Sequence, residues 1–122
     1  MGLDMYAYAV NNNMVINDFN FIKETHDEEF FCWRKHPNLH GWMEQLYKSK
    51  GGTEEFNCVY VRLTLDDLME LRKAVTHGKL PHTTGFFFGK SDEDKDERTL
   101  LFIDIAVGYI EDGYAVYYTS WW

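Results

Sequence analysis

Three basic or titratable side chains stand next to a tryptophan in a pattern typical of anion binding. Arg34, Lys35 and His36 directly follow Trp33 and precede a helix that the sequence predicts over residues 38–50. The first turn of a helix leaves backbone N–H groups without helical partners and carries partial positive charge. Cations beside such a terminus suit a phosphate or carboxylate. The alternative is structural: the cations offset the acidic run just upstream, and the tryptophan belongs to the core.

The helix over residues 38–50 is predicted by apolar residues at the i, i+3, i+4, i+7 and i+8 spacing of one helix face. Pro37 and Asn38 are typical of a helix start, and the pair Gly51-Gly52 is typical of a helix end. The apolar positions are Leu39, Trp42, Met43, Leu46 and Tyr47.

Two histidines have a spacing that can hold a metal ion. His36 and His40 are four residues apart and would share a helix face. However, His36 precedes Pro37, which biases it away from helical geometry, and no cysteine or carboxylate completes a ligand set. We therefore predict no metal and no cofactor.

The elements around this stretch predict the α+β class. Strand and helix patterns alternate without regular βαβ spacing, which favours a small, mostly antiparallel sheet with about three helices on one face. Residues 1–122 form a single domain of sufficient length to bury a core. Strands are predicted over residues 3–10, 29–34, 56–63 and 114–122, and helices over residues 38–50, 65–77 and 98–111.

A second aromatic block follows the second predicted helix. Phe86, Phe87 and Phe88 are consecutive and point to both faces of any strand, so they are either core or a recognition loop. Thr83 is one of the polar residues beside them. The candidate ligand-binding residues are Trp33, Arg34, Lys35, His36, His40, Trp42, Thr83, Phe86, Phe87 and Phe88.

Composition limits the partners and the compartment. The net charge of −8 opposes binding to nucleic acid and to anionic membranes. No apolar run approaches the length of about 20 residues that a membrane span requires. Two cysteines do not form a disulfide framework, so we expect a reducing cytoplasm. Cys32 and Cys58 have apolar neighbours in the sequence and are predicted to be buried and structural.

Sequence motifs of common enzyme classes are missing. The chain has no phosphate-binding GxxxxGK[ST] loop, no GxGxxG, no GxSxG and no HExxH. The paired carboxylates Asp66-Asp67 and Glu54-Glu55 lie at predicted turns and helix starts, where capping explains them. No catalytic residue is assigned.

Four segments together resemble a family of small proteins from tailed phages and prophages. These segments are the opening MGLDMY, Trp33-Arg34-Lys35, His40-x-Trp42, and the block from Leu80 to Gly89 with the pattern LPxTxGFFFG. Some family members are labelled phosphoglycerate kinases, but the nucleotide-binding motifs are missing here. This chain departs from the family in a short segment before Trp33 and in a charged rather than tyrosine-rich stretch over 91–98. The resemblance implies an origin in a phage or prophage and implies no mechanism.

Three hypotheses for function remain open at this point. The first is a small protein that binds an anionic molecule or nucleotide in the host cytoplasm. The second is an interaction module that inhibits a host protein through aromatic and acidic surface. The third is a small hydrolase that depends on histidine or a metal.

Overall fold

A computed structural model describes residues 2–23, 28–85 and 93–122. In these residues a four-stranded sheet has the order β2-β1-β4-β3, and every neighbouring pair of strands is antiparallel. The strands are β1 (Asp4–Asn11), β2 (Glu28–Arg34), β3 (Val61–Leu63) and β4 (Tyr114–Trp121). The predicted α+β class is confirmed.

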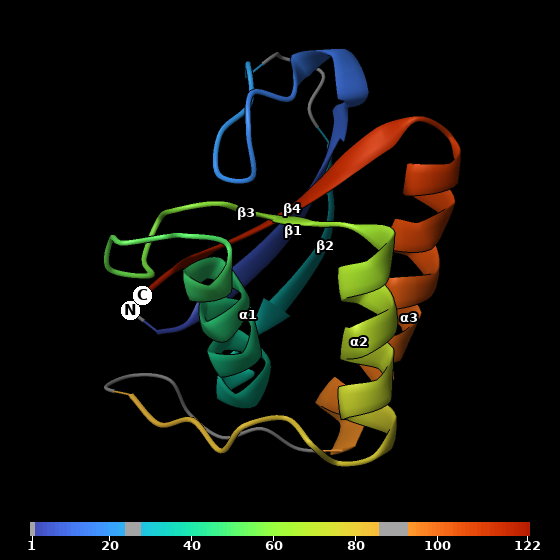
Figure 1. Cartoon of the computed structure of the whole chain (residues 1–122). Coiled ribbons are helices and arrows are strands. Elements are labelled where there is room, and N and C mark those ends of the chain that lie inside the picture. The colour runs from blue at the N-terminus through green and yellow to red at the C-terminus, as the bar shows by residue number, and fades with distance from the viewer. Residues whose placement is uncertain (1, 24–27, 86–92) are drawn as a thin grey trace.

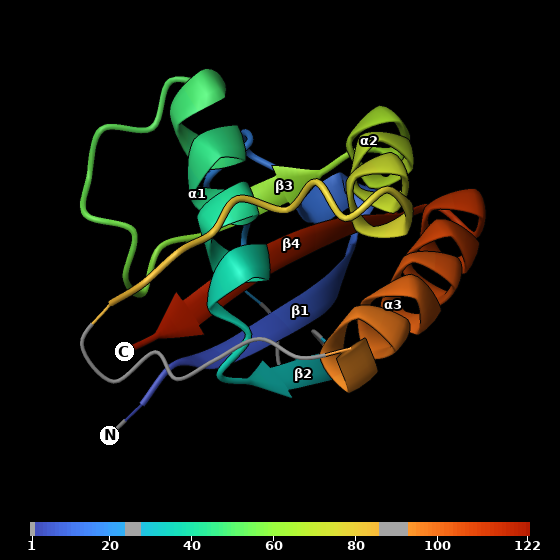
Figure 2. The ribbon, with the colours of Figure 1, turned by 90° about the horizontal axis from the view of Figure 1, so that it is seen from below.

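Three α-helices pack on one face of this sheet, as Figure 2 shows. They are α1 (Pro37–Ser49), α2 (Leu65–Thr76) and α3 (Glu93–Glu111), and a short 3-10 helix, η1 (Asn12–Met14), follows β1. Within the described residues, no helix combines the length and apolar character needed to cross a membrane.

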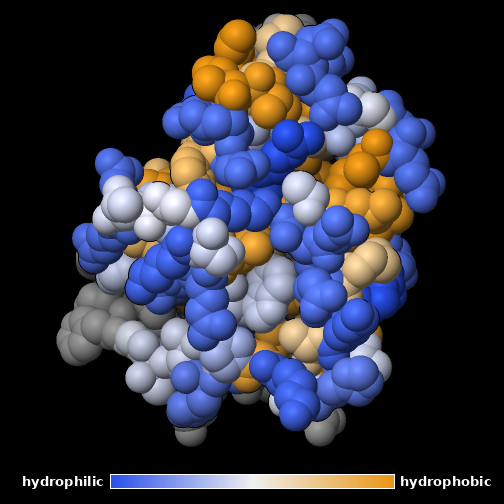
Figure 3. Space-filling view, viewed as in Figure 1, coloured by the Kyte–Doolittle hydropathy of each residue, from blue (hydrophilic) through white to orange (hydrophobic). Residues whose placement is uncertain are grey.

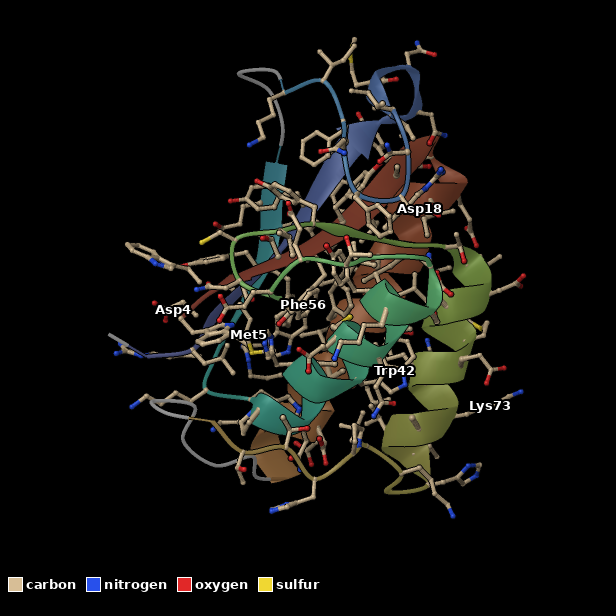
Figure 4. All side chains as sticks on the ribbon, turned by 60° about the vertical axis from the view of Figure 1, so that its left-hand side comes forward. Asp4, Met5, Asp18, Trp42, Phe56 and Lys73 are labelled. Atoms are coloured by element: carbon tan, nitrogen blue, oxygen red, sulfur yellow. The ribbon has the colours of Figure 1, made fainter. Side chains whose placement is uncertain are left out.

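The main core lies between the helices and the sheet because alternate strand residues point to opposite faces. On β1, Met5 and Ala7 are fully buried beneath the helices, and on β4 the neighbouring Tyr118 is fully buried as well. Phe56 stacks on Tyr118 with a ring distance of 5.8 Å, and Figure 4 shows Met5 and Phe56 in the interior. The aromatic-rich composition therefore fills a dense core.

The edge strand β2 contains an irregularity that brings two consecutive phenylalanines towards the helices. The register with β1 shifts between Ala7 and Tyr8, as expected for a β-bulge. Phe30 then packs 4.7 Å from Tyr109, and Phe31 packs 5.6 Å from Phe102, measured between ring centroids. Bulged edges pair poorly with foreign strands, so this feature protects the edge.

A smaller core lies on the opposite face, beneath the segment 14–23. The hydroxyl of Tyr117 on β4 donates to the carbonyl oxygen of Asn17 at 2.7 Å, and Phe21 packs 4.7 Å from the Tyr117 ring. The segment carries the exposed residues Ile16 and Ile22, and apolar surface is visible over it at the top of Figure 3. This segment covers only the end of the face near the β1–η1 turn.

Both cysteines are exposed, so the prediction of buried structural cysteines is wrong. Cys32 alternates with the core residues of β2 and therefore points to the face without helices. The predicted strand over residues 56–63 forms a strand only over Val61–Leu63. Cys58 therefore lies outside the strand, in a turn. The apolar neighbours of Cys32, which are Phe31 and Trp33, point instead to the helix side of the sheet.

The last strand is interior to the sheet. β4 lies between β1 and β3, and its residues 115–120 are buried. Trp121 is 66% exposed, whereas the Trp122 indole N–H donates to the Phe56 carbonyl at 2.8 Å. Only one of the two final tryptophans is therefore held against the protein.

Candidate functional site

Strand geometry separates two predicted site residues that are adjacent in sequence. Trp33 pairs with Met5 and is 4% exposed on the helix side of the sheet. Arg34 pairs with Asp4 on the face without helices, and its side chain is 71% exposed. Arg34 is therefore directed away from the α1 N-terminus, beside which the sequence placed it. Phe86, Phe87 and Phe88 lie outside the described residues.

The buried indole of Trp33 has a structural role. Its Nε1–H donates to the Thr99 hydroxyl at 3.2 Å, and that hydroxyl donates to the Lys95 carbonyl at 2.9 Å. The Lys95 ammonium in turn donates to the carbonyl of Lys35, at 2.5 Å. Lys35 adopts a φ of 57°, which turns the chain from β2 into α1. These contacts attach the end of β2 to the first turns of α3.

The two candidate histidines are both buried at the start of α1. His36 is the N-cap residue of α1, and its Nε2 lies 3.2 Å from a carboxylate oxygen of Asp96. His40 is 2% exposed, and its Nδ1 lies 2.8 Å from the hydroxyl of Tyr118. Buried histidines with these partners position α1 over the sheet. They give the hydrolase hypothesis no support.

Burial lowers the pKa of His40 to about 4. The unfolded chain binds a proton at His40 near pH 6.5, whereas the folded chain does so only near pH 4. The unfolded state therefore holds more protons between these values, and stability falls as the pH falls through this window. We expect His40 to account for a loss of about 2 kcal/mol in unfolding free energy between pH 7.5 and pH 5.

Urea unfolding at a series of pH values measures this dependence. His40→Asn keeps a polar atom near Tyr118 and should flatten the slope of stability against pH, whatever its effect at neutral pH. An unchanged slope in His40→Asn would contradict the assignment.

Thr83 and Trp42 contribute to packing around α1. The backbone N–H of Thr83 donates to Asn38 Oδ1 at 3.0 Å, so the segment after α2 crosses the beginning of α1. This contact brings Thr83 against Gly41, where a Cβ atom would lie 2.9 Å from the Thr83 Cβ. Trp42 is half-buried and lies on the α2 side of α1 (Figure 4).

Arg34 lines a cavity of about 420 Å³ beside the edge strand β2. Its Nε lies 3.8 Å from Asp4 Oδ1, which holds the guanidinium beside β1. Arg98 reaches the same cavity from α3, and its Nη2 donates to the Cys32 carbonyl at 2.8 Å. The lining residues are Asp4, Tyr6, Cys32, Trp33, Arg34 and Arg98.

An exposed aromatic side chain stands in the same row of residues. Asp4 pairs with Arg34 on one side and with Trp121 on the other, so the three residues form a row across β2, β1 and β4. Neighbouring side chains on one sheet face lie about 5 Å apart, and diagonal neighbours lie about 7 Å apart. Tyr6 is the next residue of β1 on this face and therefore lies within reach of Trp121.

This arrangement combines two guanidinium groups with a phenol and an indole. Guanidinium groups bind phosphate or carboxylate through two parallel hydrogen bonds, and aromatic rings provide surface for a flat group. Arg34 was among the residues predicted from the sequence, whereas Asp4, Tyr6, Arg98 and Trp121 were not. The alternation in MGLDMYAYA was a usable signal, because it places Asp4 and Tyr6 on one face.

In the part of the chain that the structure describes, no group of three or more histidine, cysteine or acidic residues is arranged to hold a metal ion. Comparisons with protein-family models, with curated proteins and with solved structures found no match to this chain.

Proposed function

We propose that this chain is a binding protein of phage or prophage origin that takes up a small molecule bearing a phosphate or carboxylate group. The site is the cavity lined by Arg34 and Arg98 beside the edge strand β2. The observation that carries the proposal is that Arg34 of β2 and Arg98 of α3 both line one cavity.

Each guanidinium is positioned by contacts that leave donors for a ligand. Arg98 stacks over the Phe31 ring at 4.8 Å and uses Nη2 for the Cys32 carbonyl. Arg34 contacts Asp4 through Nε at 3.8 Å. Since a guanidinium carries five N–H donors, both side chains retain hydrogen-bonding capacity towards an anion.

The cavity also favours ligands that carry a planar group in addition to the anionic group. Its volume of about 420 Å³ lies within the range of about 300–1,000 Å³ typical of small-molecule sites. Tyr6 lines the cavity with the cations, so a ligand with both an anionic and a planar part gains more than an inorganic ion. Asp4 opposes ligands whose anionic groups extend past Arg34.

The proposed compartment follows from the two exposed cysteines. Cys32 and Cys58 are exposed and unpaired thiols. Exposed thiols persist in a reducing compartment, so the bacterial cytoplasm of the host is the proposed location.

An interaction module stays a prediction, and the exposed Ile16 and Ile22 are the described residues that favour it.

Cys32 provides a direct measurement of ligand binding because its thiol lines the proposed site. Alkylation by iodoacetamide, followed by mass spectrometry of the Cys32 peptide, should slow in the presence of AMP and to a lesser degree of inorganic phosphate. Adenosine, which lacks the anion, should leave the rate at Cys32 unchanged. If neither AMP nor phosphate slows alkylation at millimolar concentration, the proposal is wrong.

Substitutions then test the two cations. Arg34→Ala and Arg98→Ala should each raise the AMP concentration that half-protects Cys32 by about tenfold, since a hydrogen bond to a charged group contributes about 1.5 kcal/mol. Lys73→Ala removes an exposed cation from α2, on the side of the molecule away from Asp4 in Figure 4. This control should leave the protecting concentration unchanged.

A further inference from the structure

A second cavity has a volume of about 490 Å³ and is lined by residues different from those of the Arg34 cavity. It lies between the segment 19–23, the C-terminal end of α1, and the chain that leads from α1 into β3. No pattern in the sequence indicates this cavity, because these three segments are brought together only by folding.

Four aromatic rings from three segments form its walls. Phe19 meets Tyr47 of α1 edge to face, with ring centroids 5.1 Å apart, and Phe21 meets Tyr60 in the same way at 5.0 Å. Edge-to-face packing holds rings in fixed orientations. The walls are therefore preorganised for a flat, apolar group.

Hydrogen-bond donors and hydrogen-bond acceptors both surround these rings. Lys23 places its ammonium 5.1 Å from the centroid of the Tyr60 ring, and Asn20 lies nearby on the same segment. Thr53 and Glu54 face the cavity from the loop after α1. Ammonium and amide groups donate hydrogen bonds, whereas carboxylate, amide and hydroxyl oxygens accept them. This combination suits a ring whose edge carries both donors and acceptors.

The backbone of the third wall has unusual conformations. Gly51 has a φ of 103°, and Gly52 lies so close to the Tyr47 ring that a side chain there would clash with it. Cys58 has a φ of 60°, in the left-handed region that residues other than glycine seldom adopt. Its N–H donates to the Ser120 carbonyl at 2.8 Å, which holds the turn and places the residue in the cavity wall.

We propose that this cavity is a second ligand site, which takes an uncharged planar heteroaromatic ring such as a nucleobase or nucleoside. The ring lies among Phe19, Tyr47 and Tyr60, and its edge bonds to Lys23 and Glu54. This proposal does not rest on the anion site, because the two cavities are lined by separate residues.

The thiol of Cys58 reports on this site as Cys32 reports on the other. Adenosine should slow iodoacetamide alkylation of Cys58 and leave Cys32 unaffected, whereas inorganic phosphate should leave Cys58 unaffected. Cyclohexanol tests whether any apolar molecule is sufficient and should not protect. Protection by cyclohexanol equal to that by adenosine, or no protection by adenosine, would overturn the proposal.

Two variants locate the ligand without reliance on one fold-sensitive position. Tyr60→Ala should raise the half-protecting concentration of adenosine by about tenfold, as expected for loss of a stacking ring. Tyr114→Ala, at an exposed tyrosine of β4, is the matched control and should have no effect. Glu54→Ala lies in an exposed loop and should weaken protection while leaving the thermal midpoint unchanged. Unchanged protection in both Tyr60→Ala and Glu54→Ala would contradict the assigned cavity.

Discussion

Asp67→Ala is expected to lower the unfolding free energy by about 3 kcal/mol, because the carboxylate of Asp67 joins two stabilising interactions. It accepts the backbone N–H of Thr64 at 2.9 Å, while the Asp67 N–H donates to the Thr64 hydroxyl at 3.2 Å. This reciprocal pair is the capping box of α2. The same carboxylate oxygen lies 2.6 Å from the ammonium of Lys50.

The ion pair is largely withdrawn from water, which explains the size of the effect. The Lys50 and Asp67 side chains are 14% and 17% exposed, and Lys50 also donates to the Arg62 carbonyl at 2.7 Å. Loss of the cap costs about 1 kcal/mol. A half-buried ammonium without its carboxylate costs about 2 kcal/mol more.

Urea unfolding measures this loss as a lower midpoint at an unchanged slope. Asp66→Ala is the matched control, because Asp66 is exposed in the same first turn and contributes only about 0.5 kcal/mol through the helix dipole. Adding Lys50→Met to Asp67→Ala should recover part of the loss by removing the unpaired charge. Equal losses in Asp66→Ala and Asp67→Ala would show that the pair with Lys50 contributes nothing.

Gly41→Ala is expected to destabilise the protein by about 3 kcal/mol, although alanine favours helix over glycine by about 1 kcal/mol. A Cβ at position 41 would overlap the Thr83 hydroxyl oxygen and lie 2.9 Å from the Thr83 Cβ. Thr83 is held by its N–H bond to Asn38 and by its hydroxyl bond to the Pro81 carbonyl. The segment 81–85 must therefore shift, and both bonds are lost.

A glycine-to-alanine substitution on α3 provides a control whose expected effect on stability has the opposite sign. Gly108 has no atom within 4 Å of a built Cβ, so Gly108→Ala should stabilise by about 1 kcal/mol. The double variant Gly41→Ala/Thr83→Gly removes the obstructing side chain and should recover most of the loss relative to Thr83→Gly alone. Thermal and urea unfolding measure both effects. A stabilising Gly41→Ala would show that the segment moves aside without cost.

Local signals predicted two helices to within about a residue at each end. The cap of α2 and the glycines after α1 act within a few residues of the positions they fix, so the chain alone specifies them. The start of α3 was predicted at residue 98 but lies at Glu93. The charged run before residue 98 has no apolar periodicity, and its place in the helix depends on contacts such as Lys95 with the Lys35 carbonyl.

In the first half of the predicted strand over residues 56–63, local sequence signals predicted the wrong structure. Its residues have strand propensity, yet Cys58 turns the chain, and β3 covers only Val61–Leu63. Phe56 is instead drawn into the core against Tyr118. Strand propensity reflects packing on neighbouring strands, so a short sequence window does not decide it.

Residue types and local spacing were sufficient to predict the class of fold, the acid-rich charge, the boundaries of α1 and α2, and the presence of Arg34 near the end of a strand. Each of these depends on residue type or on spacing within one element. That Arg34 lines one cavity with Arg98 depends on the folded arrangement, because strand order and the position of α3 arise from contacts between distant segments. The aromatic cavity beside Cys58 was decided in the same way, since its walls come from three separate parts of the chain.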